Sequence, residues 1–283
     1  MTQYIFHADF DKFNPNTARY FGENALLLTD CAKLAYEQEA TIREAMLTTG
    51  KFKNFKFFSG KSTQAFIAGS DAAIIIAFRG TEKKVADIIA DAKVKPTKGP
   101  VGLVHSGFND ALHEVWGGNT NENDMRLTIK SFQDNNQTIW FCGHSLGAAL
   151  ATLAAAEYAI NDGGMINGLY TIGQPRVGND EFAKHFDSVV VNKCFRFVNN
   201  NDVVTRIPVP DPACKYTHVG NMLYIDSKGK LNDSIPWWKK LWDGIKGLEK
   251  DIGSKGLDAL NDHGSEGYVR LIANNRAVTT KWS

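Results

Sequence analysis

The stretch Thr138-Ile-Trp-Phe-Cys-Gly-His-Ser-Leu-Gly147 decides how this chain folds and where its chemistry lies. Its apolar first half, Thr138–Cys142, predicts a buried strand, and the nearly all-apolar run Ala148–Ile160 predicts a helix. Between them lies Gly143-His-Ser-Leu-Gly147, a G-x-S-x-G pentapeptide. The bare pattern arises by chance in roughly one chain of ten at this length, so its position between a strand and a helix carries the argument.

A serine in such a turn is predicted to be a nucleophile. A tight connection from strand to helix forces the central residue into a strained backbone conformation, and flanking glycines relieve clashes with the neighbouring backbone. Ser145 would then project from the carboxyl end of the sheet, and the helix would point its positive N-terminus at a developing oxyanion. The alternative is that Ser145 only caps the helix.

A serine hydroxyl needs a base, which in this arrangement follows the nucleophile and the acid in the chain. Three histidines lie downstream of Ser145. His185 falls in a predicted helix ahead of any suitable acid, and His218 lies in an extended apolar run typical of a buried structural histidine. His263 lies in a polar loop, 261–268, ahead of an apolar segment. We therefore expect His263 to be the base.

The acid that orients this base should follow a strand and precede His263. The segment 199–208 directly follows the predicted strand 194–198 and contains Asp202, which could hold the His263 tautomer. Asp211 is the main competitor and Asp187 a weaker one, and capping of a turn is the alternative role for Asp202.

The rest of the chain predicts an α/β fold in one domain, residues 1–283, with a mostly parallel central sheet flanked by helices. Early apolar runs broken by turn residues predict hairpins, and strand and helix signals then alternate. The expected helices are 23–49, 108–116, 123–132, 148–160 and 181–186, and the expected strands are 55–58, 64–68, 73–78, 138–142, 169–172 and 194–198.

Composition excludes several classes of function. The 283 residues are 43% hydrophobic and carry a formal net charge of +1, which supports a sizeable core and gives no reason to expect a nucleic-acid or strongly acidic partner. No window approaches the roughly 18 apolar residues of a membrane span. Residues 1–10 lack the pattern of a secretory signal, which leaves the cytoplasm or signal-independent export as the expected locations. Oligomeric state is not readable from these patterns.

The four cysteines, Cys31, Cys142, Cys194 and Cys214, form no C-x-x-C pair and no cluster with zinc spacing. Free thiols are the expected state, with a Cys194–Cys214 disulfide as the alternative. No metal or cofactor motif is visible.

Several segments, in order, resemble the fungal-type or class 3 lipases of the α/β-hydrolase superfamily. They span about residues 55–225 and are Phe78-Arg-Gly-Thr81, Val104-His-Ser-Gly-Phe108, Gly143-His-Ser-Leu-Gly147, Gly173-Gln-Pro-Arg-Val-Gly-Asn179, Asn201-Asp-Val-Val-Thr-Arg-Ile-Pro208 and His218-Val-Gly220. The set is far more specific than any one motif, and His263 extends it.

The resemblance implies an α/β-hydrolase fold with a catalytic triad of Ser145, Asp202 and His263. It also implies an oxyanion hole at Thr81 and Leu146. Two features depart from the family pattern: Tyr268 follows His263 by five residues where a tighter His-x-x-Tyr spacing is common, and the disulfide pattern of the secreted fungal members is missing.

Two segments suggest a lipid substrate and contact with a lipid–water interface. Residues 82–92, at the family's lid position, place Val85, Ile88 and Ile89 at helical spacing, with a permanently packed helix as the alternative. Residues 236–252 contain three tryptophans interleaved with lysines, typical of an amphipathic helix in a membrane surface, with an ordinary packed helix as the alternative.

The predicted activity is hydrolysis of acylglycerol esters through an acyl-enzyme. Phospholipase A and small-ester (including feruloyl) esterase activity use the same chemistry and stay open. A non-catalytic lipid- or membrane-binding protein is the alternative from another class.

Overall fold

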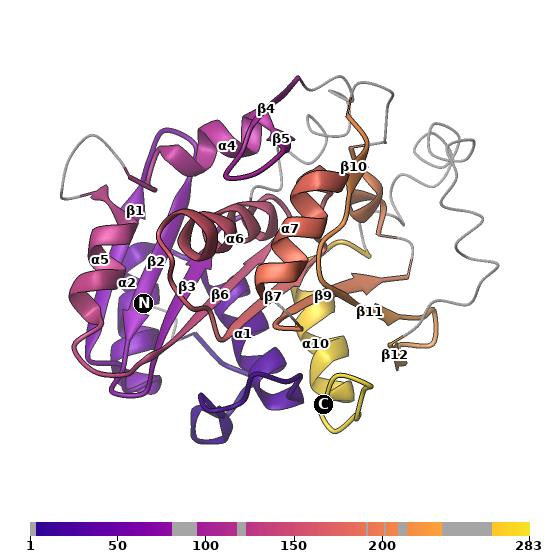
Figure 1. Cartoon of the computed structure of the whole chain (residues 1–283). Helices are drawn as coiled ribbons and strands as arrows, with labels where there is room; N and C mark the ends of the chain where they lie inside the picture. Colours follow the sequence, from indigo (N-terminus) through magenta and orange to yellow (C-terminus); the bar gives the residue numbers. More distant parts are fainter. Residues whose placement is uncertain are drawn as a thin grey trace.

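A computed structural model of the chain describes residues 4–80, 95–117, 123–190, 192–200, 202–208, 214–233 and 262–283 (Figure 1). Within these ranges eight strands form the main sheet, in the order β1-β2-β3-β6-β7-β9-β11-β12. Their bounds are β1 Asn54–Ser59, β2 Gln64–Gly69, β3 Ala73–Phe78, β6 Thr138–His144, β7 Gly168–Ile172, β9 Cys194–Asn199, β11 Asn221–Ile225 and β12 Leu231–Asn232.

The centre of this sheet is parallel. Strands β3, β6, β7, β9 and β11 pair in parallel, whereas β1, β2 and β3 pair antiparallel, as do β11 and β12. The turn residues at 60–63 and 70–72 produce the two early hairpins that the sequence predicts. The fold class expected from the sequence, a mostly parallel sheet flanked by helices, is confirmed.

Helices cover both faces of the sheet, and each face has its own hydrophobic cluster (Figure 1). Strand β3 is buried on both sides, with Ile74 and Ile76 in one cluster and Ile75 in the other, as the two-residue period of a strand requires. The first cluster includes α4 Ser106–His113, α5 Met125–Phe132, α6 Leu146–Ala156 and α7 Asp180–Val190. The second includes α1 Gly22–Leu34, α2 Glu39–Glu44 and α10 Ser265–Asn275.

The long helix expected over residues 23–49 is wrong in its continuity. Helix α1 ends at Leu34, the connection 35–38 is non-helical, and α2 is followed directly by a short π-helical turn, η2, at Ala45–Thr49. Similarly, α6 ends at Ala156 and is followed directly by a π-helical turn, η4, at Glu157–Asn161. Apolar spacing is compatible with both continuous and broken helices, so the pattern alone does not locate these breaks.

A second, antiparallel sheet was not predicted. Its order is β10-β8-β5-β4, with bounds β4 Pro96–Lys98, β5 Leu103–His105, β8 Gly178–Asn179 and β10 Tyr216–Thr217. Strands of two or three residues are too short to show alternation in a sequence. Two 3-10 turns complete the described elements, η1 at Phe10–Lys12 and η5 at Val203–Arg206.

Two predicted elements, the helices at 82–92 and 236–252, lie outside the described residues. In the part of the chain that the structure describes, no helix is both long enough and apolar enough to traverse a bilayer. The single-domain organisation stays a prediction.

The topology brings two of the predicted site residues to one edge of the sheet. Ser145 directly follows β6, and Asp202 lies three residues beyond β9. Both strands point the same way and are separated only by β7, so their carboxyl ends open on the same side.

Candidate active site

Ser145 occupies the strained turn that its glycine neighbours predict. Its backbone has φ 58° and ψ −126°, a conformation that costs a non-glycine residue about 1–3 kcal/mol. The Ser145 N–H donates to the Ile172 carbonyl across 3.0 Å, which ties the turn to β7. A Cβ on Gly143 would collide with the backbone of Gly147, and one on Gly147 would collide with the carbonyl of Phe78. Only glycine fits at both flanking positions.

The side chain of Ser145 is buried at the start of helix α6, with 1% of the residue exposed. The following residue, Leu146, begins that helix, and the first N–H groups of a helix have no carbonyl partner inside it. The Leu146 N–H and the positive end of the helix are therefore available to an anion beside the serine.

Asp202 is held with its carboxylate at the edge of the sheet. It is the N-cap of η5, where Oδ1 accepts the Val204 N–H across 2.9 Å. Its backbone is fixed as well, because the Thr205 hydroxyl donates to the Asp202 carbonyl across 2.8 Å. Only 1% of the residue is exposed. The turn-capping role considered from the sequence is thus real, but it uses only part of the carboxylate.

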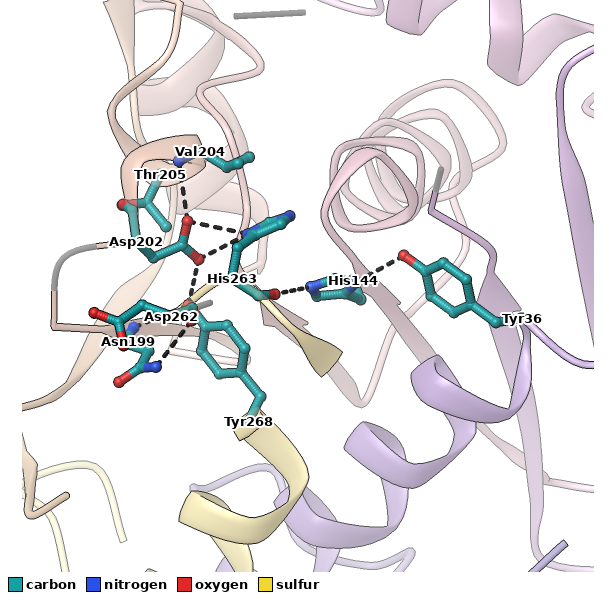
Figure 2. A network of polar contacts seen from close by, with 9 residues as sticks. All are labelled: Tyr36, His144, Asn199, Asp202, Val204, Thr205, Asp262, His263 and Tyr268. Carbon is teal, nitrogen blue, oxygen red and sulfur yellow. Dashed lines mark hydrogen bonds and ion pairs between the residues drawn. The ribbon is translucent and has the colours of Figure 1, made fainter. Parts of the chain in front are cut away.

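His263 contacts both oxygens of that carboxylate (Figure 2). Its Nδ1 lies 3.0 Å from Oδ1 and 2.9 Å from Oδ2 of Asp202, and both residues are buried. A carboxylate only accepts hydrogen bonds, so Nδ1 carries the proton and Nε2 of the neutral ring is left with its lone pair. This is the tautomer that a general base acting through Nε2 requires.

Tyr268, on the first turns of α10, supports the same carboxylate. Its hydroxyl donates to Oδ2 of Asp202 across 2.6 Å and accepts the Asn199 N–H across 2.9 Å. Burial and the neighbouring Asp202 raise the pKa of Tyr268 well above its usual value, so the hydroxyl stays protonated and remains a donor. The five-residue spacing from His263, which departs from the family pattern, still places this tyrosine on the acid.

Gly173 packs closely against both His263 and Asp202. It has φ +60°, and a Cβ there would lie 2.8 Å from Cε1 and Nδ1 of His263 and 3.0 Å from Oδ2 of Asp202. Because Gly173 follows the strand β7 that also holds the Ser145 N–H, it connects the imidazole to the nucleophile turn.

The structure brings Asp202 and His263 into direct contact but shows no hydrogen bond between His263 and Ser145. Among the described residues, neither the Ser145 hydroxyl nor Nε2 of His263 has a hydrogen-bond partner, although both are buried. Catalytic hydrogen bonds are often unmade in free enzymes and tighten when substrate binds.

The competing candidates have other contacts. His185 is exposed on α7, and His218 uses Nε2 to donate to the Thr205 carbonyl across 2.7 Å. Asp187 accepts the Gly220 N–H across 2.7 Å. Asp211 lies outside the described residues.

Thr81, the other predicted oxyanion residue, also lies outside the described residues. Gly80, directly before it, is described and lies against the nucleophile turn: a Cβ on Gly80 would collide with the Tyr36 hydroxyl and the His144 carbonyl. The chain leading to position 81 is thus fixed beside Ser145.

Sequence reasoning missed His144 and Asn199, which contact the segment that bears His263, and Tyr36, which contacts His144 (Figure 2). His144 is the variable position of the pentapeptide, where no rule assigns a role. Tyr36 lies more than a hundred residues away in the chain. No local pattern could have identified either contact.

The cysteines lie apart from this site's chemistry. All four are buried, and no disulfide joins Cys194 to Cys214 or any other pair of them. Burial raises the pKa of Cys142, on the nucleophile strand, above its usual value. The described residues contain no group of three or more His, Cys, Asp or Glu side chains arranged to hold a metal ion.

Comparisons with known proteins find relatives of this chain among the lipases. A family model described as Lipase (class 3) matches residues 75–211, which include Ser145 and Asp202. A triacylglycerol lipase of Arabidopsis thaliana is 30% identical over 247 residues, covering 69% of this chain and 48% of the relative. A secreted mono- and diacylglycerol lipase of Penicillium cyclopium is 31% identical over 198 residues, covering 68% and 60%. The chain thus spans about half to three-fifths of the length of these curated relatives.

Solved structures agree. The Rhizomucor miehei triacylglyceride lipase superposes with a TM-score of 0.55 and 27% identity, covering 74% of this chain and 82% of that one. A triacylglycerol lipase whose catalytic centre is described as a serine protease triad gives a TM-score of 0.56 and 26% identity over the same shares. With a family model, sequence relatives and folds in agreement, the chain belongs to the class 3 lipase family.

Proposed function

We propose that this protein is a serine ester hydrolase that cleaves acylglycerols, with Ser145, Asp202 and His263 as its catalytic triad. One observation carries the proposal. A buried carboxylate holds an imidazole in the tautomer whose free nitrogen is Nε2, and that imidazole lies against His144, the residue directly before a buried serine at φ 58°. A buried polar atom without a hydrogen-bond partner needs an explanation, and a triad that binds substrate supplies one for the Ser145 hydroxyl and for Nε2 of His263.

In the proposed reaction, Nε2 of His263 takes the Ser145 proton while Oγ attacks the ester carbonyl carbon. The resulting imidazolium is stabilised by Asp202. The oxyanion would receive hydrogen bonds from the Leu146 N–H and from Thr81, each such donor being worth about 3–4 kcal/mol in the transition state. His263 then protonates the departing alcohol, and a water molecule, activated by the same nitrogen, releases the fatty acid from Ser145.

The proposed substrate class rests on the relatives. Those described above are named as triacylglycerol, triacylglyceride or mono- and diacylglycerol lipases. We further propose that the protein works at a lipid–water interface, using residues 82–92 as a lid and 236–252 as a surface-binding segment. A similar solved structure is described as a fungal lipase–inhibitor complex that gives a model for interfacial activation, which supports this extension.

The chemistry is tested with Ser145→Ala against Ser188→Ala, an exposed serine whose hydroxyl donates to the His185 carbonyl on α7. Ser145→Ala should lower ester turnover by roughly 10⁴-fold or more with an unchanged fold, and the control should retain wild-type turnover. Near-normal activity of folded Ser145→Ala protein would exclude the proposed nucleophile.

The substrate is tested with a panel of p-nitrophenyl esters of rising chain length, triglyceride emulsion and phospholipid vesicles. The proposal predicts turnover of the emulsion and a preference for long acyl chains. Faster turnover of vesicles would indicate a phospholipase A, and activity on short esters alone would indicate a small-ester esterase. A folded protein inactive on every ester would favour a lipid-binding protein without catalysis.

A further inference from the structure

His144, the residue directly before the nucleophile, contacts the segment that bears the base. It lies buried at the end of β6, and its Nε2 is 2.6 Å from the main-chain carbonyl oxygen of His263 (Figure 2). Its Nδ1 is 2.7 Å from the hydroxyl of Tyr36, which follows α1. The rings of His144 and His263 are 4.6 Å apart between centroids. One imidazole thus joins a helix end to the base.

These contacts fix the protonation of His144. A carbonyl oxygen only accepts hydrogen bonds, so Nε2 of His144 carries a proton and donates a hydrogen bond to the main-chain carbonyl of His263. Burial, and then the neighbouring His263, lower the pKa of His144 well below its usual value, so the ring is neutral. Nδ1 of a neutral ring protonated at Nε2 is an acceptor, and the Tyr36 hydroxyl donates to it. The His263 carbonyl therefore fixes the tautomer, and the Tyr36 hydroxyl supports it by donating to Nδ1.

A second contact holds the adjacent carbonyl. The Asn199 side-chain amide, at the end of β9, donates to the Asp262 carbonyl across 2.8 Å. Two consecutive carbonyls, of Asp262 and His263, are thus held from the ends of β6 and β9. These are the two strands that lead into Ser145 and Asp202.

Such contacts matter most for His263 because no strand fixes it. Ser145 and Asp202 follow the sheet directly, whereas His263 lies in a turn before α10. The position of its imidazole therefore depends on hydrogen bonds to its backbone as well as on Asp202. A misplacement of about 1 Å can cost 100-fold in rate.

We propose that His144 is a positioning residue for His263, acting through the main-chain carbonyl of that residue, with its own ring held in place by the Tyr36 hydroxyl. The inference rests on the proposed function, because it assigns His144 a purpose in presenting the base to Ser145. A residue that only stabilised the core would change folding without changing the chemistry of the folded enzyme.

The test compares His144→Leu, which removes the donor, with His144→Gln, whose amide nitrogen can replace Nε2–H. His144→Leu should lower kcat on a soluble ester by about 10- to 100-fold with little change in KM, and should shift the acid limb of the kcat/KM pH profile. His144→Gln should recover most of the loss. Folded His144→Leu protein with wild-type kcat and an unmoved acid limb would overturn the inference, as would equal losses in both variants.

Tyr36→Phe keeps the test decisive if His144→Leu does not fold. Its matched control is Tyr20→Phe, because the buried Tyr20 hydroxyl has no partner among the described residues and its ring packs on Phe195. Tyr36→Phe should lower kcat several-fold and move the acid limb, and Tyr20→Phe should do neither. Identical behaviour of the two variants would contradict the inference.

His263→Ala separates this failure from failure of the proposed function. If folded His263→Ala protein hydrolyses esters normally, the proposed function itself is wrong. If His263→Ala is inactive while His144→Leu and Tyr36→Phe are both normal, only the positioning role is wrong.

Discussion

Tyr268 donates its hydroxyl proton to Oδ2 of Asp202 across 2.6 Å, which links helix α10 to the carboxylate that holds the imidazole. The same hydroxyl accepts the Asn199 N–H, so the tyrosine is fixed from the end of β9 as well. The acid therefore receives hydrogen bonds from the base, from its own turn and from the helix that follows the base.

Tyr268→Phe should consequently remove one of the hydrogen bonds that hold the Asp202 carboxylate, while Asp202 itself stays in place. A hydrogen bond to a charged group contributes about 1.5–3 kcal/mol, and 1.4 kcal/mol corresponds to a tenfold change in rate. We expect kcat to fall by roughly tenfold and the free energy of unfolding to fall as well, measured by ester turnover and urea titration. Unchanged kcat would show that the other donors are sufficient to hold Asp202.

Gly173→Ala should displace the imidazole. The added methyl would lie 2.8 Å from the His263 ring at a φ of +60°, so both a collision and backbone strain result. We expect kcat to fall by about 100-fold. Gly267→Ala on α10 is the matched control, because nothing lies within 4 Å of the new methyl. Equal turnover by the two variants would be incompatible with the described position of His263.

The low pKa of His144 predicts a pH dependence of stability. The folded state keeps this ring neutral, whereas the unfolded chain protonates it below about pH 6.5, so the unfolded state binds more protons there. Stability should therefore fall as pH drops below about 6.5, by up to about 1.4 kcal/mol per pH unit for this group.

His144→Gln isolates this contribution. Burial and the neighbouring Arg196 and Arg176 also lower the pKa of His218. His218 therefore lowers stability at acid pH equally in the wild type and in His144→Gln. The difference in unfolding free energy between wild type and variant, measured by urea titration, should therefore shrink as pH falls from 7 to 5. A constant difference across that range would mean that His144 is not kept neutral by the fold.

Replacement of Trp237, Trp238 and Trp242 by alanine tests the proposed interface segment. Tryptophan is favoured at the headgroup level of a membrane, so liposome binding measured by co-sedimentation should weaken. Hydrolysis of a soluble short-chain ester should be spared, because the triad is unchanged. Equal losses in both assays would indicate that the segment is an ordinary packed helix.

Much of the fold could be predicted because its signals are local. The alternating and apolar runs of β1 to β3 and β6, and the glycines around Ser145, impose their structure through nearest neighbours. The two-residue strands β8 and β10 could not be predicted, since their pairing depends on segments more than thirty residues apart. The break in the helix after Leu34 could not be predicted, because the spacing of apolar residues does not change there.

The candidate site divides in the same way. Ser145, Asp202 and His263 could be selected from motif, chain order and flanking strands. The contact of His263 with Asp202 is present in the structure, and the catalytic roles stay predictions. Tyr36 and His144 join the site through tertiary packing, which no spacing rule encodes. Tyr268 could be noted from the family's His–Tyr spacing, but its hydrogen bond to Asp202 could not.

The most direct measurement of the central claim is to identify the residue that an active-site fluorophosphonate modifies. After incubation and proteolysis, mass spectrometry should find the phosphonyl group on the peptide containing Ser145, at one equivalent per chain, and His263→Ala should abolish the labelling. Rapid modification of another serine, or equal labelling of His263→Ala protein, would contradict a hydroxyl activated by that imidazole.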